Sequence, residues 1–162
     1  MSGLDKAGIN IHAANAGSLT QMAALHAASF DEAWGEAALS EILAMPGAFA
    51  LVVTACDDEQ APQLLGFVLA RVAADEAEIL SVAVDISHRA QGVGRKLMEA
   101  AAATAIASGA VSLFLEVADD NLSALALYER LGFVTVGLRP AYYARGATRV
   151  AARTMRMDLA KA

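Results

Sequence analysis

With 162 residues, the chain is long enough to bury a real core, and we expect residues 1–162 to fold as a single domain. Apolar residues make up 57% of it, which excludes a disordered chain, and its one cysteine, Cys56, excludes a disulfide framework and a thiolate metal cage. The net charge is −6, although residues 139–162 are basic, and this acidic balance argues against nucleic-acid binding.

The sequence predicts neither a signal peptide nor a membrane-spanning segment. The first ten residues lack the basic start and apolar core of a signal peptide. The longest uncharged run, residues 100–115, falls short of the ~20 residues that a bilayer requires, and Gly109 interrupts it. We therefore expect a cytoplasmic protein without membrane contact.

The first half of the chain predicts one strand, two helices and three more strands. Residues 9–14 alternate like a short strand, and apolar residues at helical spacing predict helices over 18–30 and 32–45. Three strand-like runs follow, separated by short acidic turns: 48–56, 64–73 and 77–84. Such short connections predict an antiparallel meander.

The second half alternates helices with strands. Periodicity predicts two helices and three strands there: helix 92–107, strand 111–117, helix 122–131, strand 133–137 and a last strand near 150–159. No internal repeat or linker divides the chain. The element order predicts an α/β (α+β) fold, in which helices flank a mixed sheet.

The stretch HRAQGVGRKLMEA, residues 88–100, combines two glycines with three basic residues at the start of a helix. Glycines there leave backbone N–H groups uncovered at the positive end of the helix dipole, an arrangement that binds phosphate. A nucleotide-binding P-loop requires Gly-Lys-Ser/Thr, but Arg95-Lys96-Leu97 follows Gly94, and a dinucleotide motif requires a small residue at Leu97. A glycine turn that merely starts a helix stays an alternative.

Two motifs at a fixed separation carry a resemblance to a known family. The first is Arg89-x-x-Gly92-x-Gly94, and the second is LEVADDNLSALALYERLGF, residues 115–133. Together they resemble the pyrophosphate motif and second conserved block of the GCN5-related N-acetyltransferases (GNAT). The following Arg139-Pro140-Ala141-Tyr142-Tyr143 is similar to RimI-like ribosomal-protein-alanine N-acetyltransferases. The resemblance implies a GNAT-like mixed, mostly antiparallel central sheet.

The resemblance implies acetyl-CoA as cosubstrate. In the family, the strand before the glycine loop pairs with the pantetheine arm, the loop holds the pyrophosphate, and an asparagine of the second block reaches the cofactor. The matching positions are Val82, Ala83, Val84, Arg89, Ala90, Gln91, Gly92, Val93, Gly94, Arg95 and Asn121. We expect no metal, because the spacing of the three histidines does not suggest a site.

The resemblance also implies two catalytic residues, Glu116 as the base and Tyr128 as the acid. A carboxylate suffices to deprotonate an α-amine, and a phenol can protonate a departing thiolate. Each residue has a simpler interpretation. Glu116, the only charge in its strand, could face solvent, and Tyr128 could be an ordinary helix residue packed on the sheet.

For the acceptor, the resemblance implies a protein N-terminus, possibly that of a ribosomal protein. Trp34 in a covering segment would line one wall, although it could simply anchor two helices to the sheet, and Arg139, Tyr142 and Tyr143 would line the other. The segment after the tyrosines departs from the subgroup, because it carries arginines where acidic residues are more usual. An acetyltransferase for a small amine and a non-catalytic acyl-CoA sensor remain alternatives.

Overall fold

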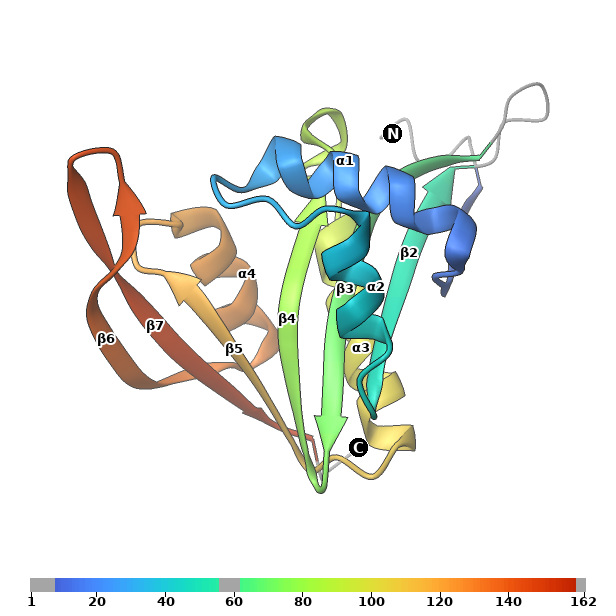
Figure 1. Cartoon of the computed structure of the whole chain (residues 1–162). Helices are drawn as coiled ribbons and strands as arrows, with labels where there is room; N and C mark the ends of the chain where they lie inside the picture. Colours follow the sequence, from blue (N-terminus) through green and yellow to red (C-terminus); the bar gives the residue numbers. More distant parts are fainter. Residues whose placement is uncertain (1–7, 56–61, 160–162) are drawn as a thin grey trace.

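The computed structural model describes residues 8–55 and 62–159, so Cys56 and the first seven residues lie outside the described residues. One seven-stranded mixed sheet forms the centre of the structure (Figure 1). Its strands and the four α-helices are, in chain order, β1 Ile9–Ala13, α1 Leu19–Ser29, α2 Glu36–Leu43, β2 Ala48–Ala55, β3 Gln63–Ala73, β4 Glu76–Val84, α3 Val93–Ala107, β5 Ser112–Ala118, α4 Leu122–Leu131, β6 Val134–Arg145 and β7 Thr148–Asp158. No helix of the described segments is both long and apolar enough to cross a membrane.

The strand order in the sheet is β1-β2-β3-β4-β5-β7-β6. Strands β1 to β4 pair antiparallel with their neighbours, which confirms the predicted meander. Strand β5 joins β4 in parallel, and β7 and β6 complete the sheet with antiparallel pairs. The fold is therefore the mixed, mostly antiparallel α/β arrangement that the sequence predicts.

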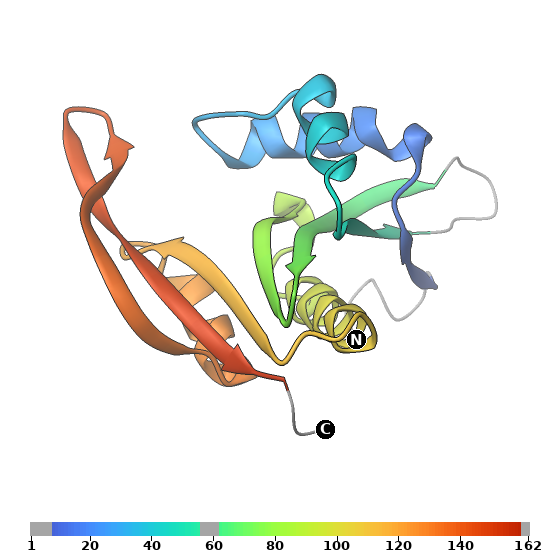
Figure 2. The ribbon, with the colours of Figure 1, turned by 60° about the horizontal axis from the view of Figure 1, so that its bottom comes forward.

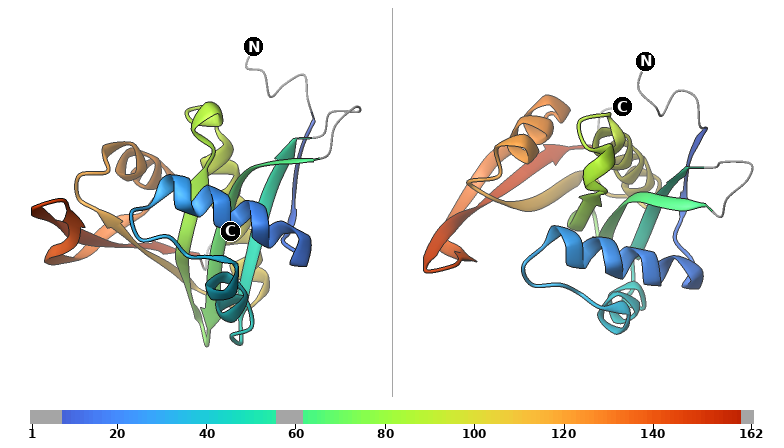
Figure 3. Two further views of the ribbon diagram at one scale, coloured as in Figure 1. Left: turned by 45° about the horizontal axis from the view of Figure 1, so that its top comes forward. Right: turned by 90° about the horizontal axis from the view of Figure 1, so that it is seen from above.

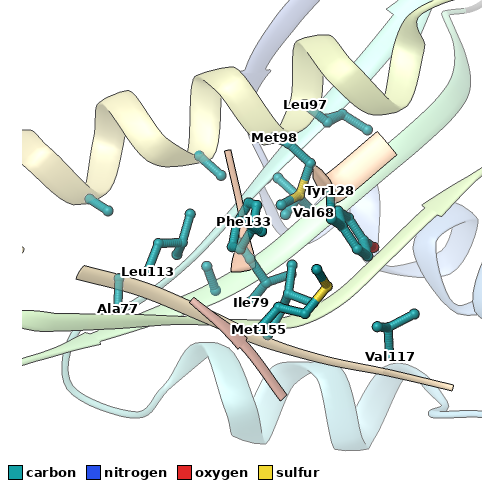
Figure 4. Close-up of a cluster of buried hydrophobic side chains, with 14 of the residues drawn as sticks. Val68, Ala77, Ile79, Leu97, Met98, Leu113, Val117, Tyr128, Phe133 and Met155 are labelled. Atoms are coloured by element: carbon teal, nitrogen blue, oxygen red, sulfur yellow. The ribbon is translucent and has the colours of Figure 1, made fainter. Parts of the chain in front are cut away.

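Helices cover both faces of the sheet, with α1 and α2 on one face and α3 and α4 on the other (Figure 2). Beneath α1 and α2 lies a small core that contains Met22, Leu39 and Phe67. The larger core lies beneath α3 and α4, and Figure 4 shows Leu113 and Met155 within it. Burial of these alternating strand side chains holds the helices to the sheet.

Strands β4 and β5 meet at one end and separate at the other (Figures 1 and 3). Their register covers only Glu76–Ile79 of β4 and Ser112–Leu115 of β5. At this point β4 carries a bulge, because Ile79 and Ser81 oppose consecutive residues of β3 and Leu80 is left between them. A bulge bends its strand, so β4 turns where it parts from β5.

Two predicted elements have different limits in the structure. The helix predicted over 32–45 begins only at Glu36, because Gly35 is its extended N-cap and the preceding residues form a loop. The strand predicted over 133–137 continues to Arg145. Its register with β7 jumps from Arg139 to Tyr143, so residues 140–142 form a bulge. Pro140 lacks an N–H group for the ladder and is tolerated at such a position.

Candidate functional site

The glycine loop begins where β4 ends and leads into α3. Ala90 and Gly92 adopt left-handed conformations, with φ of 60° and 83°. The first bond of α3 runs from the Lys96 N–H to the Gly92 carbonyl at 3.1 Å. The N–H groups of residues 93–95 precede that bond, so they lie at the open start of the helix. This is the geometry that the sequence predicts for a phosphate-binding turn.

Short-range hydrogen bonds shape the segment between β4 and the loop. The Asp85 carboxylate accepts the Ser87 N–H at 2.9 Å, and this bond is the main reason why the pKa of Asp85 is lowered. The backbone N–H of Asp85 donates to the Leu65 carbonyl at 2.8 Å. Arg89 donates from Nε to the Val84 carbonyl at 3.1 Å and stays exposed. The loop is therefore preformed, with a cationic side chain at its rim.

Glu116 is the first residue of β5 beyond its register with β4, at the point where the strands part. Its neighbours on β5, Leu115 and Val117, point into the core under α3 and α4, so alternation places Glu116 on the opposite face. The side chain is 24% exposed, and its Oε1 lies 3.3 Å from the Nε of Arg139. Glu116 is thus partly buried and paired, unlike a freely solvated surface carboxylate.

Tyr128 lies on the inner face of α4, 6% exposed, with its ring edge-on to Phe133 at 5.8 Å (Figure 4). Burial raises its pKa to about 12, and Tyr143 contributes in the same direction. The pKa of Tyr143 is itself raised, first by burial and then by Glu116. Tyr128, Tyr143 and Glu116 thus form an electrostatically connected group, and Tyr128 keeps its proton at neutral pH.

Two adjacent tyrosines of β6 are flanked by an arginine on each side. The Cζ atom of Arg139 lies 5.4 Å from the centre of the Tyr142 ring, and that of Arg145 lies 5.6 Å from the centre of Tyr143. The two tyrosines meet edge to face at 5.1 Å. The bulge of β6 presents this row, which we name the hairpin wall: Arg139, Tyr142, Tyr143 and Arg145.

Acidic partners neutralise Arg145 and Arg153, two of the three arginines that distinguish this chain from the RimI-like pattern. Arg145 pairs with Asp120 at 3.2 Å and approaches Asp31, in the loop between α1 and α2, at 3.9 Å. Arg153 pairs with Asp119. The basic C-terminal segment is therefore less cationic at the site than the sequence suggests.

The structure gives Trp34 and Asn121 local roles. The Trp34 ring stacks on His26 at 4.9 Å, and the backbone N–H of Trp34 donates to the His26 Nδ1 at 3.0 Å, so this residue anchors the loop between α1 and α2. Burial lowers the pKa of His26, which favours the neutral ring that accepts this bond. Asn121 caps α4 by accepting the Ala124 N–H at 3.3 Å. Contact with acceptor or cofactor stays a prediction for both residues.

Glu78 of β4 is a residue of this region that the sequence reasoning missed. It lines, with Glu116 and Arg139, a pocket of about 320 Å³ beside the junction of β4 and β5. Although Glu78 remains exposed, partial loss of hydration raises its pKa, and Glu116 raises it further, while Arg139 and Arg71 act oppositely. The pattern Glu76-Ala77-Glu78 within a strand was the available signal, because it places two acids on one face.

These features place a preformed glycine loop next to a strand separation and an acid–tyrosine group. A family model described as the acetyltransferase (GNAT) family matches residues 19–133, more than half of the chain. The chain belongs to the GNAT acetyltransferase family. The GNAT resemblance stated from the sequence motifs is thereby confirmed.

Relatives within GNAT place the chain near enzymes that acetylate protein N-termini. The [ribosomal protein bS18]-alanine N-acetyltransferase of Escherichia coli K12 is 38% identical over 81 residues, which cover 50% of this chain and 55% of that protein. N-alpha-acetyltransferase RimI of Mycobacterium tuberculosis is 42% identical over 91 residues, which cover 56% of this chain and 54% of that protein. The matches thus span about half the length of these curated relatives.

Solved GNAT structures share the fold over nearly the whole chain. The crystal structure of the Escherichia coli ribosomal-protein-S18-alanine N-acetyltransferase has a TM-score of 0.84 at 27% identity, covering 95% of this chain and 96% of that one. Arabidopsis thaliana NAA60 in complex with acetyl-CoA has a TM-score of 0.79 at 16% identity, covering 93% and 98%, which shows a common fold.

Proposed function

We propose that this GNAT protein transfers acetyl from acetyl-CoA to the α-amine of a protein N-terminus, of the ribosomal-protein-alanine type. One observation carries the proposal. The partly buried Glu116 lies where the β4–β5 register ends, Tyr143 is electrostatically coupled to both Glu116 and the protonated Tyr128, and β4 leads into the cationic glycine loop. The names of the relatives in Escherichia coli and Mycobacterium tuberculosis support the acceptor class.

The residues present fit acetyl-CoA. The loop offers N–H groups at the start of α3, and Gly92 leaves open space toward solvent, because a Cβ there would meet no atom within 4 Å. Arg89 adds positive charge at the rim of the loop for a pyrophosphate, and Arg95 adds a second guanidinium, whose charge is offset by Glu99 at 2.8 Å. Beyond Ile79, the β5-facing edge of β4 has no register partner in the described chain, which leaves backbone groups of Val82 and Ala83 for an amide-bearing arm, while the Val84 carbonyl already accepts the Arg89 Nε–H.

The side chains supply the two proton transfers of the reaction. Glu116 accepts a proton from the acceptor ammonium, a mild task because an α-amine has a pKa of about 7.7–8.0. The neutral amine then attacks the acetyl carbonyl carbon. The buried phenol of Tyr128, which stays protonated at neutral pH, gives its proton to the departing sulfur and regains one from the newly acylated nitrogen. Bound acetyl-CoA supplies the activated acyl group for this chemistry.

A peptide with the N-terminal sequence of ribosomal protein bS18, beginning with alanine, tests the proposal. Incubation with acetyl-CoA is expected to add one acetyl group by mass spectrometry, and an N-terminally blocked copy is expected to stay unmodified. Acetylation of polyamines or amino acids in place of the peptide would redirect the assignment to a small-amine enzyme. Binding of acetyl-CoA with no transfer to any amine would indicate a sensor.

Glu116→Gln tests the base in the same assay. The substitution keeps the shape of the side chain but removes its proton-accepting charge, so we expect kcat at neutral pH to fall by about 10²- to 10⁴-fold. Acetyl-CoA affinity by calorimetry is expected to stay near that of the wild type. Unchanged turnover would remove Glu116 as the base.

A further inference from the structure

One histidine fixes both ends of the loop between α1 and α2, residues 30–35, which we name the covering loop. The His26 carbonyl accepts the Phe30 N–H at 3.0 Å, where α1 ends. The ring Nδ1 of the same histidine accepts the backbone N–H of Trp34 at 3.0 Å, shortly before α2 begins. The covering loop therefore leaves from His26 and returns to it.

The imidazole of His26 is a buried polar ring in aromatic surroundings. It is 3% exposed, and the centres of the Phe30, Trp34 and Phe67 rings lie 4.4, 4.9 and 6.3 Å from its own. Because Nδ1 accepts an N–H, the neutral ring carries its proton on Nε2. A protonated ring has donors on both nitrogens and no acceptor, so the bond to Trp34 requires the neutral ring.

Charged side chains on the elements that pack against His26 have other surroundings. They are Asp31 and Glu32 of the covering loop, Glu36 and Glu41 of α2, and Arg71 of β3. All four acids are exposed, and Glu36 accepts a hydrogen bond from the Thr20 hydroxyl at 2.7 Å. Arg71 donates to the Pro46 carbonyl. Burial is accordingly the one cause that lowers the pKa of His26 from its ordinary value.

The covering loop reaches the hairpin wall. Figures 1 and 3 show it extending toward the β6–β7 hairpin, and Asp31 lies 3.9 Å from Arg145. Arg145 in turn lies over the ring of Tyr143, which is coupled to Glu116. Glu116 is directed to the face of the sheet that α1 and α2 cover. The covering loop and the hairpin wall therefore meet on the side of the sheet from which an acceptor would approach Glu116.

We propose that His26 is a positioning residue for the acceptor, because its neutral ring holds the covering loop against the hairpin wall and its protonated ring releases the loop. The inference rests on the proposed function, which assigns this side of the sheet to the acceptor. A proton taken from water onto Nδ1 would place a donor opposite the Trp34 N–H, and the bond would be lost. Since burial favours the neutral ring, the loop is held at neutral pH and released in mild acid.

Trp34 fluorescence tests the switch without any turnover, because Trp34 is the only tryptophan. Between about pH 8 and pH 5, we expect its emission to shift to longer wavelength as the released ring gains water, with a midpoint below 6.5. His26→Asn keeps an acceptor oxygen but does not titrate, so its emission is expected to stay constant. His12→Asn, which removes an exposed histidine of β1, is expected to titrate as the wild type. The same shift in His26→Asn and the wild type overturns the proposal.

Steady-state kinetics with the alanine-started peptide tests the positioning role. His26→Phe keeps an aromatic ring but cannot accept the Trp34 N–H, so we expect KM for the peptide to rise severalfold at neutral pH and kcat to stay within about twofold. His26→Asn, the conservative variant, is expected to restore the KM of the wild type. An effect confined to kcat would contradict a role in positioning the acceptor.

The pH dependence of KM separates His26 from the other titrating groups. Glu116 and the acceptor amine titrate alike in the wild type and in His26→Asn, so the ratio of their KM values isolates His26. We expect a ratio near one at about pH 8 and a severalfold higher KM for the wild type at about pH 5. This comparison still decides the matter if His26→Phe fails to fold, and a ratio that is constant with pH overturns the proposal.

The two proposals fail in different ways. A wild-type protein that acetylates no amine contradicts the proposed function, while the fluorescence titration still decides whether His26 holds the covering loop. Acetylation of the peptide by the wild type, together with a constant KM ratio, contradicts only the role of His26.

Discussion

Tyr128 combines two roles that the sequence presents as alternatives. Its ring packs in the core against Phe133, as expected for an amphipathic helix residue. The same burial raises its pKa to about 12, so the phenol is a weaker acid than an ordinary tyrosine, although both are protonated at neutral pH. Packing in the core and a role as proton donor do not exclude each other, because the donor role depends on the hydroxyl alone.

Tyr128→Phe separates the hydroxyl from the ring. The ring contacts remain, so we expect acetyl-CoA affinity by calorimetry to stay within about twofold while kcat falls by about tenfold or more. A large loss of acetyl-CoA affinity with kcat retained would instead indicate a binding role for the hydroxyl.

The same variant is expected to change the alkaline stability. An ordinary tyrosine ionises near pH 10 in the unfolded chain, whereas Tyr128 ionises near 12 in the folded protein. Folding is therefore penalised as the pH rises from 10 toward 12, by about 2 kcal/mol for this one group. Urea unfolding at pH 9 and 12 is expected to show a smaller loss for Tyr128→Phe than for the wild type.

At the scale of the element, the glycine loop contains two left-handed residues, Ala90 and Gly92, and Gly92 lies at the start of α3. Gly92 has a φ of 83°, which side-chain-bearing residues rarely adopt, and a Cβ there would meet no atom within 4 Å. Gly109, after the end of α3, has a φ of 93° and equally open space. The two glycines thus share a conformational requirement but differ in location, which makes them a matched pair.

Alanine at each glycine separates backbone strain from ligand binding. Both Gly92→Ala and Gly109→Ala are expected to lower the free energy of unfolding by about 1 kcal/mol, measured with urea, because alanine is strained at positive φ. Only Gly92→Ala is expected to weaken acetyl-CoA binding, by about tenfold or more, since its Cβ occupies the open space at the helix start. Equal affinities for the two variants would remove the loop as the pyrophosphate site.

Elements with a strong hydrophobic period could be predicted from the sequence, and those set by register could not. Helix α4 ends at Gly132 as expected, with a φ of 104° at its C-cap. The extension of β6 past Pro140 escaped prediction because it depends on pairing with β7 across a bulge. Glu78 escaped for the same reason, since its proximity to Glu116 arises only from the parallel register of β4 and β5.

At the scale of the whole molecule, the larger core bridges the separation between β4 and β5. Only four residue pairs join these strands, yet side chains from both halves of the sheet meet in one cluster under α3 and α4. Leu113 of β5 is fully buried there, together with Ile79 of β4 and Met155 of β7 (Figure 4). The cluster is therefore expected to make the two halves unfold together.

Leu113→Ala tests this cooperativity. Removing the buried side chain is expected to cost about 2–5 kcal/mol, while Val111→Ala, two residues earlier and 41% exposed, is expected to cost far less. Trp34 is the only tryptophan and reports on the opposite face, beside α1. Its fluorescence and far-ultraviolet circular dichroism are expected to give one shared urea midpoint in each variant. Two separate midpoints would contradict a common core.

The bulge of β6 also affects the tendency of the protein to aggregate at high concentration. Strand β6 is an outer strand of the sheet, and Val134, Val136 and Leu138 expose apolar side chains along it. A long, flat edge of this kind invites a strand from another chain and starts aggregation. Residues 140–142 interrupt it with a twist and a proline that cannot donate a hydrogen bond. The bulge that positions the tyrosines thus also prevents strands of other chains from pairing along β6.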